Sequence, residues 1–386
     1  MGQNMKGCIM IRLLQIVLCV ALLQILGVHP AFADAPAPSY FGAIDLGSRG
    51  VKAYLYRFVK VRQGMAPSAV FKEDINTKLV STAQNNRFTP AGIDEATQAV
   101  AALLAKMKAK AAELNIADPN YYVVGSSGVA SFENREDLKK SVSKATGLDL
   151  SFVDAAEEAK GGYASAVPKT AEADSLFVDI GSGNTKVTCK VKDSFNPVDL
   201  RFGTVTTRTK AVGAGGEYGD ALKTLVDGEV SQSYESERMN TPCLASRKRV
   251  YMIGGAVWAM ATLAHPEGAY WSYLELTRND VDSVLRRLKD GTYTNDPVIH
   301  FAAAVPESQQ AAVRAEAGKN RKKVFDTFSK EDLMAGASLV RLMMSKSSPG
   351  SHTYFARNGN YLYGYAIVKY ASLQVDSKPD PLLAGN

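Results

Sequence analysis

Cysteine and histidine are scarce in this chain of 386 residues, which has four of each. The sequence contains no Cys-x-x-Cys pair, and the histidines after residue 33 lack the helical pairing of metal sites: they are His265, His300 and His352. A zinc site is therefore not expected. Basic residues are not interleaved with aromatic ones in any stretch, so nucleic acid is not expected as a partner.

Long apolar runs are also missing, except near the N-terminus at residues 13–28. Two basic residues precede this run, and residues 31–33 (Ala-Phe-Ala) have the small side chains that signal peptidase accepts. We therefore expect residues 1–33 to be a cleaved signal peptide and residues 34–39 to be a Pro/Ala linker. The alternative is an uncleaved membrane anchor. Cleavage would leave no stable membrane anchor and would place the protein in a bacterial periplasm.

The part of the chain after the leader is too long for one comfortable core and suits two domains. Its charge is mildly basic, +6 for the full sequence, which suits a polyanionic substrate without identifying one. Only Cys189 and Cys243 follow the leader. In an oxidising compartment they are an even pair, but a disulfide and two separately buried thiols both stay open.

Two glycine-containing turns, about 130 residues apart, are the most informative feature of the sequence. They read Asp45-Leu46-Gly47-Ser48-Arg49-Gly50 and Asp179-Ile180-Gly181-Ser182-Gly183-Asn184. Each stands between two short apolar runs, which predicts strand, tight turn and strand. Backbone N–H groups and Ser or Asn side chains bind anions at such turns, while the Asp can face a divalent cation. Two such hairpins facing each other would clamp a phosphate chain.

Two acidic residues lie between these turns in the sequence. Glu157 and Glu158 fall in the first turn of a helix that Asp154 is expected to cap. A carboxylate aimed at a phosphate site can orient and deprotonate an attacking water. The alternative is that both glutamates only complement the helix dipole.

Two further loops add candidate anion donors. Ser126 and Ser127 close a predicted strand, and Gly254 and Gly255 stand between a strand and a helix. Backbone at a helix N-terminus can approach an anion. Close packing of helix on strand is the alternative reason for the second pair.

In this order, the segments resemble the exopolyphosphatase/guanosine pentaphosphate phosphatase (Ppx/GppA) family of the sugar kinase, Hsp70 and actin superfamily. The resemblance rests mainly on residues 43–48, 126–130, 155–159, 179–185, 201–205 and 254–255. It implies an α/β fold of two actin-like (ribonuclease H-like) lobes, each a five-stranded mixed sheet with helices, and an active site in the interlobe cleft. Lobe I would be residues 40–172, with 353–374 packing back on it, and lobe II residues 173–352.

The resemblance also implies hydrolysis of a terminal phosphoanhydride in polyphosphate or a nucleoside polyphosphate. Glu158 would be catalytic, and Asp45 and Asp179 would serve catalysis by holding Mg²⁺ or another divalent cation. The expected phosphate-binding residues are Gly47, Ser48, Arg49, Lys52, Ser126, Ser127, Gly181, Ser182, Gly183, Asn184, Gly254 and Gly255. Family members often dimerise, so a homodimer is also expected.

Departures from the family pattern leave a second function open. Ala130 replaces an Arg of the phosphate loop, Lys186 replaces the acidic residue that usually ends the second turn, and Arg49-Gly50 replaces Asn-Ser. Arg49 and Lys186 either restore the charge missing at Ala130 or remove metal binding, which would leave an inactive polyphosphate- or nucleotide-binding protein. The first hairpin is also similar to that of ecto-apyrases, so the substrate stays open between polyphosphate and nucleotides.

Overall fold

A computed structural model describes residues 40–61, 64–117, 119–293, 299, 301 and 305–367. The expected signal peptide, the linker and the last residues of the expected C-terminal segment lie outside this part of the chain. Within the described residues, no helix has both the length and the apolar character needed to cross a membrane.

The first sheet has five strands in the order β3-β2-β1-β4-β5. Their bounds are β1 Tyr40–Gly47, β2 Gly50–Val61, β3 Gly64–Asn76, β4 Asn120–Gly125 and β5 Leu150–Phe152. Strand β1 pairs antiparallel with β2 and parallel with β4, so the sheet is mixed. The expected five-stranded mixed sheet is confirmed for this half of the chain.

The second sheet has six strands in the order β10-β11-β9-β6-β7-β8. Their bounds are β6 Ser175–Ile180, β7 Thr185–Val191, β8 Ser194–Leu200, β9 Arg249–Ile253, β10 Tyr273–Leu276 and β11 His352–Ala356. Strands β8-β7-β6-β9-β11 repeat the topology of the first sheet, with β6 in the place of β1. The sheet therefore has one strand more than expected, because β10 adds an antiparallel edge to β11.

Successive side chains of β1 point to opposite faces of the first sheet. Ile44 and Leu46 belong to the core beneath α2 (Pro90–Glu113), whereas Phe41 and Ala43 pack with residues of a helix at 361–367. Because Asp45 shares the face of Phe41 and Ala43, its side chain lies on the side of the C-terminal helix.

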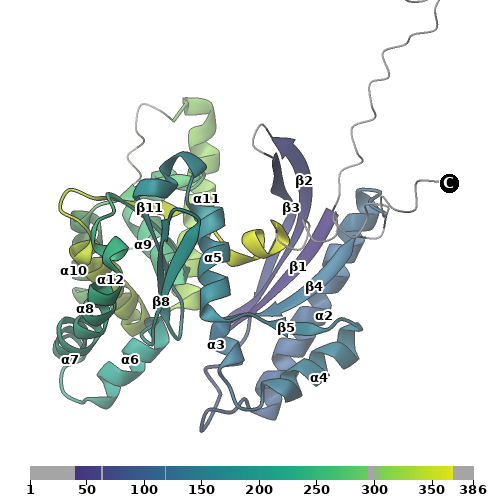
Figure 1. Ribbon diagram of the computed structural model, residues 1–386, viewed down its shortest axis with the longest axis horizontal. Helices are drawn as coiled ribbons and strands as arrows, with labels where there is room; N and C mark the ends of the chain where they lie inside the picture. Colours follow the sequence, from purple (N-terminus) through teal and green to yellow (C-terminus); the bar gives the residue numbers. More distant parts are fainter. Residues whose placement is uncertain are drawn as a thin grey trace, which may run out of the picture. The chain divides into compact units, whose positions relative to one another are not determined.

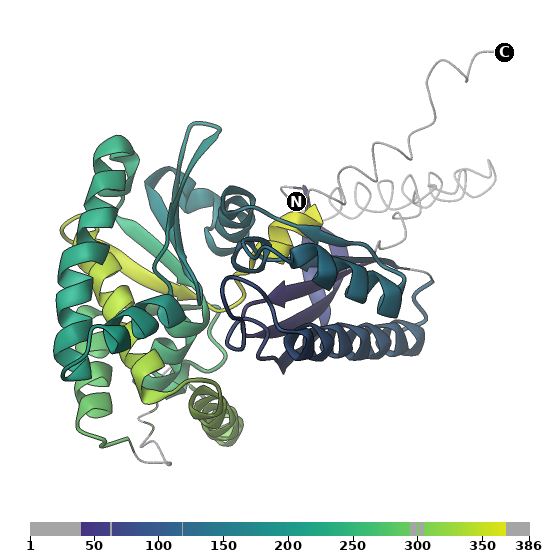
Figure 2. The ribbon, with the colours of Figure 1, turned by 90° about the horizontal axis from the view of Figure 1, so that it is seen from below.

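Helices on the first sheet begin and end at residues suited to those positions. The Thr89 side chain accepts a hydrogen bond from the Gly92 N–H at the start of α2, and Pro90 occupies the first helical position. Helix α4 (Arg135–Thr146) packs against α2 and ends at Gly147 with φ of 74°. The two helices lie side by side on this half of the molecule (Figures 1 and 2).

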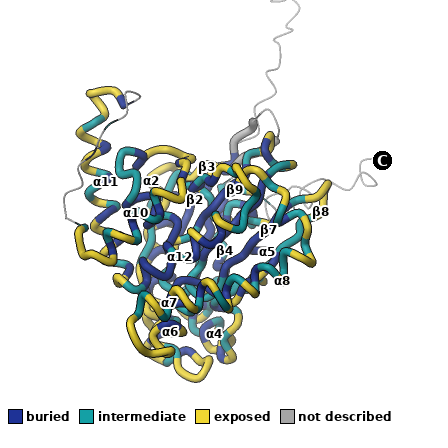
Figure 3. The backbone as a smooth tube through the Cα atoms, turned by 90° about the vertical axis from the view of Figure 1, so that its left-hand side faces the viewer, coloured by how far each residue is buried: buried dark blue, intermediate teal, exposed yellow. Residues whose placement is uncertain are grey.

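Most of the remaining helices surround the second sheet. Their bounds are α6 Thr204–Gly213, α7 Tyr218–Leu225, α8 Ser231–Asn240, α9 Gly255–Ala264, α10 Arg278–Lys289, α11 Glu307–Thr327 and α12 Lys330–Lys346. Figure 3 shows the central strands as mostly buried and many residues of the helices as exposed. Helices α9 and α12 are the most deeply buried of the set and pack against each other in the core.

Two helices cross between the halves. Helix α5 (Ala155–Ala166) follows β5 of the first sheet, but it packs on β6 to β9 of the second. The helix at 361–367 follows β11 of the second sheet and packs on the first. They approach closely, since a Cβ on Gly364 would lie 2.3 Å from the Gly161 Cα. The lobe boundaries stay a prediction, but residues 352–356 pair in the second sheet and not in the first.

Cys189 and Cys243 form a disulfide, with 6.2 Å between their Cα atoms, and lie 54 positions apart in the sequence. Cys189 is buried on β7, and Cys243 lies in a short helical turn at Pro242–Ala245. Of the two states left open by the sequence, the structure has the bonded one.

Candidate active site

The two glutamates at the start of α5 have different roles. Asp154 accepts a hydrogen bond from the Glu157 N–H at 2.7 Å, and Glu157 accepts one from the Asp154 N–H at 3.1 Å. Glu157 is therefore a capping residue and lies exposed. Glu158 is one residue further on, so its side chain points to another side of the helix, where it is 5% exposed.

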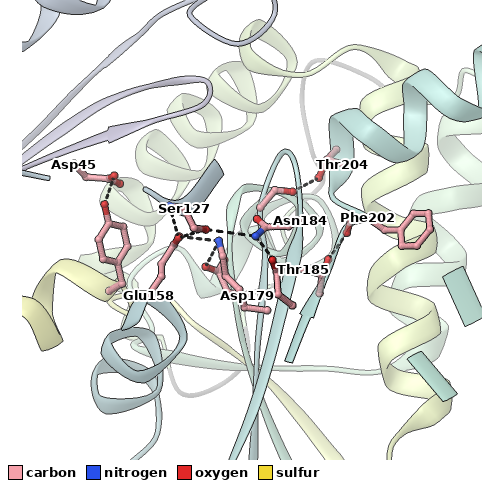
Figure 4. Close-up of polar contacts among 12 residues, drawn as sticks. Asp45, Ser127, Glu158, Asp179, Asn184, Thr185, Phe202 and Thr204 are labelled. Carbon is pink, nitrogen blue, oxygen red and sulfur yellow. Dashed lines mark hydrogen bonds and ion pairs between the residues drawn. The ribbon is translucent and has the colours of Figure 1, made fainter. Parts of the chain in front are cut away.

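Glu158 joins elements from both halves of the protein. One carboxylate oxygen, Oε2, accepts hydrogen bonds from the Ser127 N–H at 3.0 Å and the Ser127 Oγ at 2.6 Å. The other, Oε1, accepts one from the Lys186 Nζ at 2.7 Å; Figure 4 shows Glu158 between Ser127 and Asp179. Ser127 begins α3 (Ser127–Ala130), which follows β4 of the first sheet, and Lys186 belongs to β7 of the second. Burial acts to raise the pKa of Glu158, but Lys186 and Ser127 hold it below its ordinary value.

Lys186 and Asp179 are cross-strand partners in the β6–β7 hairpin. Lys186 is 3% exposed and Asp179 is 8% exposed, with 3.7 Å between Nζ and Oδ2. Burial raises the pKa of Asp179, and Glu158 adds to this rise while Lys186 opposes it. Burial acts to lower the pKa of Lys186, but the carboxylates of Glu158 and Asp179 raise it above its ordinary value. The two carboxylates thus share one buried ammonium.

Asp45 occupies the corresponding place on the first hairpin, opposite Lys52. The Tyr361 hydroxyl donates a hydrogen bond of 2.6 Å to Asp45 Oδ1. Burial raises the pKa of Asp45 to about 6, although Lys52 and the bond from Tyr361 act to lower it. Figure 4 shows Asp45 beside the group formed by Glu158 and Asp179.

The second glycine turn is held rigidly. The Gly181 N–H donates to the Asn184 carbonyl at 2.9 Å, which closes the turn. The first N–H groups of α6 donate to the carbonyls of Gly181 and Ser182, at 2.9 and 2.8 Å. The Asn184 side-chain amide donates to Asp199 at 2.7 Å and to the Ser127 Oγ at 3.4 Å. Ser127 therefore contacts both Glu158 and the second turn.

Further along the hairpin, the Thr185 hydroxyl donates to the Phe202 carbonyl at 2.7 Å (Figure 4). The Gly183 carbonyl accepts a bond from the Thr206 hydroxyl at 3.1 Å. These contacts fix the loop before α6 against the turn.

The first glycine turn meets the Ser126 loop. The Ser126 N–H donates to the Leu46 carbonyl at 3.1 Å, and a Cβ on Gly128 would lie 2.9 Å from the Ser48 Oγ. Ser48 and the start of α3 are thus adjacent, and their binding of one anion stays a prediction. Arg49 points elsewhere, since its guanidinium bonds Asp332 of α12 at 2.8 Å.

Gly254 and Gly255 have a packing role. Gly254 has φ of 107°, and a Cβ there would lie 2.2 Å from the Ile180 carbonyl oxygen. Glycine is therefore required so that the start of α9 can approach the end of β6. This was the alternative reason given for these residues, and their contact with phosphate stays a prediction.

The structure brings together Glu158, Asp179, Ser127 and Asn184. It adds two residues to the expected set. The sequence singled out Lys186 as a departure from the family pattern and a source of positive charge for phosphate, but did not predict its contact with Glu158. Tyr361 was missed because the helical periodicity of the tail and its resemblance to the family pointed to the first half of the protein, and neither identifies a partner residue.

The expected divalent cation does not fit these side chains. The Lys186 ammonium lies against the carboxylates of both Glu158 and Asp179, where a cation would have to bind. Asp45 is already held by Tyr361. Among the residues that the structure describes, no group of three or more His, Cys, Asp or Glu side chains is arranged to hold a metal ion. Magnesium at Asp45 and Asp179 is therefore not supported by the site.

Known structures share this fold. A Ppx/GppA family member from Aquifex aeolicus matches 89% of this chain over 100% of its own, with a TM-score of 0.59 and 14% identity. An exopolyphosphatase from Cytophaga hutchinsonii matches 86% of this chain over 98% of its own, with a TM-score of 0.55 and 16% identity. At such identities the likeness shows the fold, and it confirms the two-lobed, actin-like architecture. No curated protein matches the sequence.

The sequence itself matches the family model described as the Ppx/GppA phosphatase family over residues 58–292, which is more than half of the chain. The model spans the Ser127 loop, Glu158 and the second glycine turn. The chain therefore belongs to the Ppx/GppA phosphatase family.

Proposed function

We propose that this chain is an exported phosphatase that releases the terminal phosphate of inorganic polyphosphate or a nucleoside polyphosphate. The observation that carries the proposal is the position of Glu158, which contacts Ser127 from the first half and Lys186 from the second. A carboxylate accepts about four hydrogen bonds, so the three that Glu158 receives leave room for one water.

Glu158 positions this water for in-line attack on the terminal phosphorus. The water oxygen forms a bond to phosphorus while the bridging P–O bond breaks, and the electron pair of that bond leaves with the shortened chain. Glu158 takes a proton from this water, and that proton ends on the released phosphate. Phosphoryl transfer is accelerated mainly by positioning and charge stabilisation, which suits a glutamate whose pKa lies below its ordinary value.

The N–H groups and side chains of the two glycine turns bind the phosphates. Candidate donors are Ser48 and Ser127 beside the first turn and Lys186 beneath the second. A substrate panel of long polyphosphate, ATP, GTP and guanosine pentaphosphate identifies which chain is used. Phosphate release from one class at a rate at least tenfold above the others would assign the substrate.

Glu158→Gln tests the mechanism, with Glu157→Gln as its matched control. The glutamine keeps an acceptor for Ser127, so the fold should survive. We expect phosphate release to fall by about 10²–10⁴-fold in Glu158→Gln, the range for a lost acid–base group. Glu157→Gln removes only an exposed carboxylate and should retain the rate. An undiminished rate in Glu158→Gln would remove this residue from the mechanism.

A second candidate is a protein that binds polyphosphate or nucleotides without hydrolysing them. It is favoured by the ion pair of Glu158 with Lys186, because this pair weakens the carboxylate as a base. Equilibrium binding of polyphosphate to the wild type, with no phosphate released from any member of the panel, would establish this function instead.

Export rests on the predicted leader, and the disulfide is in accord with an oxidising compartment. N-terminal sequencing of the protein recovered from a periplasmic fraction should begin at Asp34. A homodimer is proposed from the family alone, and light scattering of the purified protein would give its mass. A monomer would remove that part of the proposal.

A further inference from the structure

We propose that the Lys186 ammonium is the resident cation of this site, so that no divalent metal binds between Glu158 and Asp179. Ppx/GppA phosphatases generally depend on a divalent metal. The inference concerns which cation this chain has beside Glu158 and Asp179. It rests on the proposed function only in the statement that Lys186 also neutralises the phosphate of the substrate.

The first support is geometric. Lys186 Nζ lies 2.7 Å from Glu158 Oε1 and 3.7 Å from Asp179 Oδ2, so one ammonium serves carboxylates from two different elements. Neither carboxylate can turn to bulk water, since Glu158 is 5% exposed and Asp179 is 8% exposed. A buried carboxylate must be paired, and here the chain itself supplies the cation.

The second support is the position of Nζ beside the glycine turn. A Cβ on Gly181 would lie 3.7 Å from Nζ, so the ammonium is directly adjacent to the turn expected to bind phosphate. An ammonium has three donors. One is directed at Glu158 at 2.7 Å, Asp179 lies 3.7 Å away as an ion pair, and a remaining donor can meet a phosphate oxygen. Lys186 can therefore neutralise both the protein carboxylates and the substrate.

A metal at the same carboxylates would conflict with this arrangement. Magnesium binds oxygen ligands at about 2.0–2.1 Å, in nearly octahedral geometry. A cation so close to Glu158 Oε1 would approach the ammonium, and like charges would repel with little water to screen them. Lys186 would have to leave the site before the metal could bind.

Manganese binding tests the inference without any need for activity. Electron paramagnetic resonance counts bound Mn²⁺ in the wild type, Asp179→Asn and Lys186→Gln. We expect the wild type and Asp179→Asn to bind Mn²⁺ equally poorly. Lys186→Gln, which frees two carboxylates, should gain one site per chain and bind at least tenfold more tightly.

One Mn²⁺ bound per wild-type chain and lost in Asp179→Asn would overturn the inference, even if Lys186→Gln failed to fold. If Lys186→Gln folds but binds no Mn²⁺, the inference is also overturned, because Lys186 would then not be what prevents a metal from binding. Lys186→Arg, which keeps the charge, should remain without a site. These outcomes stand apart from the proposed function, which fails only if the wild type releases no phosphate.

Discussion

The guanidinium of Arg49 lies 2.8 Å from the carboxylate of Asp332, across 283 positions of the sequence. Arg49 also lies over the ring of Phe328, with 5.1 Å between its Cζ and the ring centroid. Asp332 is buried, and it receives a second guanidinium from Arg208 at 3.1 Å. The first glycine turn is thus tied to the start of α12, and the arginine expected to bind phosphate has a protein partner.

Arg49→Met should therefore destabilise the fold. Asp332 would keep Arg208, so we expect a loss of about 1.5 kcal/mol in the free energy of unfolding, the lower end of the range for a hydrogen bond to a charged group. Urea denaturation measures the loss, and Arg208→Met is the matched control on the same carboxylate. Unchanged stability together with weakened polyphosphate binding would show that Arg49 serves the substrate instead.

Asp45→Asn should change stability in a pH-dependent way. The folded pKa of about 6 lies above the ordinary value of 3.8, so between these pH values the folded state keeps a proton that the unfolded chain has lost. The contribution of Asp45 to stability therefore falls as pH rises through this window. Above pH 6 the folded state bears the full cost of a buried, ionised Asp45. Asn cannot ionise and still accepts a bond from Tyr361.

We therefore expect Asp45→Asn to be more stable than the wild type by about 3 kcal/mol at pH 7.5, and nearly equal to it near pH 3.5. Urea denaturation at both pH values gives the two differences, in which the other titrating groups cancel. The same difference at both pH values would contradict a raised pKa at Asp45.

Gly254→Ala should be strongly destabilising. The positive φ and a Cβ at 2.2 Å from the Ile180 carbonyl oxygen act together, and we expect a loss of about 3 kcal/mol or more. Gly183→Ala is the matched control, because a Cβ there has nothing within 4 Å. Thermal unfolding compares the two variants. Equal losses would mean that contact with Ile180 is not what requires glycine at position 254.

The double variant Cys189→Ala/Cys243→Ala should be less stable than the wild type, because a disulfide restricts the conformations of the unfolded chain. A closed loop of 54 residues corresponds to about 4 kcal/mol of stability. Denaturation with and without a reducing agent measures this contribution. The reductant should destabilise the wild type and leave the double variant unchanged. A wild type indifferent to reductant would mean that the two thiols are free.

Local features of the sequence were sufficient for the elements that carry the site. The glycine turns predicted the β1–β2 and β6–β7 hairpins, because a tight turn between two apolar runs leaves few other conformations. Asp154 predicted the start of α5, because its side chain and that of Glu157 satisfy each other's N–H groups. The two hydrogen bonds join residues only three positions apart, so a short stretch of sequence is enough to predict them.

Strands β10 and β11 show where such reasoning stops. Both are short, and each becomes a strand by pairing with segments distant in the sequence: β11 lies between β9 and β10. The same holds for Tyr361, which is 316 positions from the Asp45 that it contacts. Periodicity gives the buried face of a segment but not the segment that will cover it.

The sequence by itself determined the family, the two hairpins and the helix that carries Glu158, because each depends on neighbours along the chain. Only the tertiary structure decided that Glu158 and Asp179 share Lys186 and that Arg49 pairs with Asp332. A buried charged side chain must pair with an opposite charge close to it. In this protein those partners belong to elements that come together only when both sheets have packed.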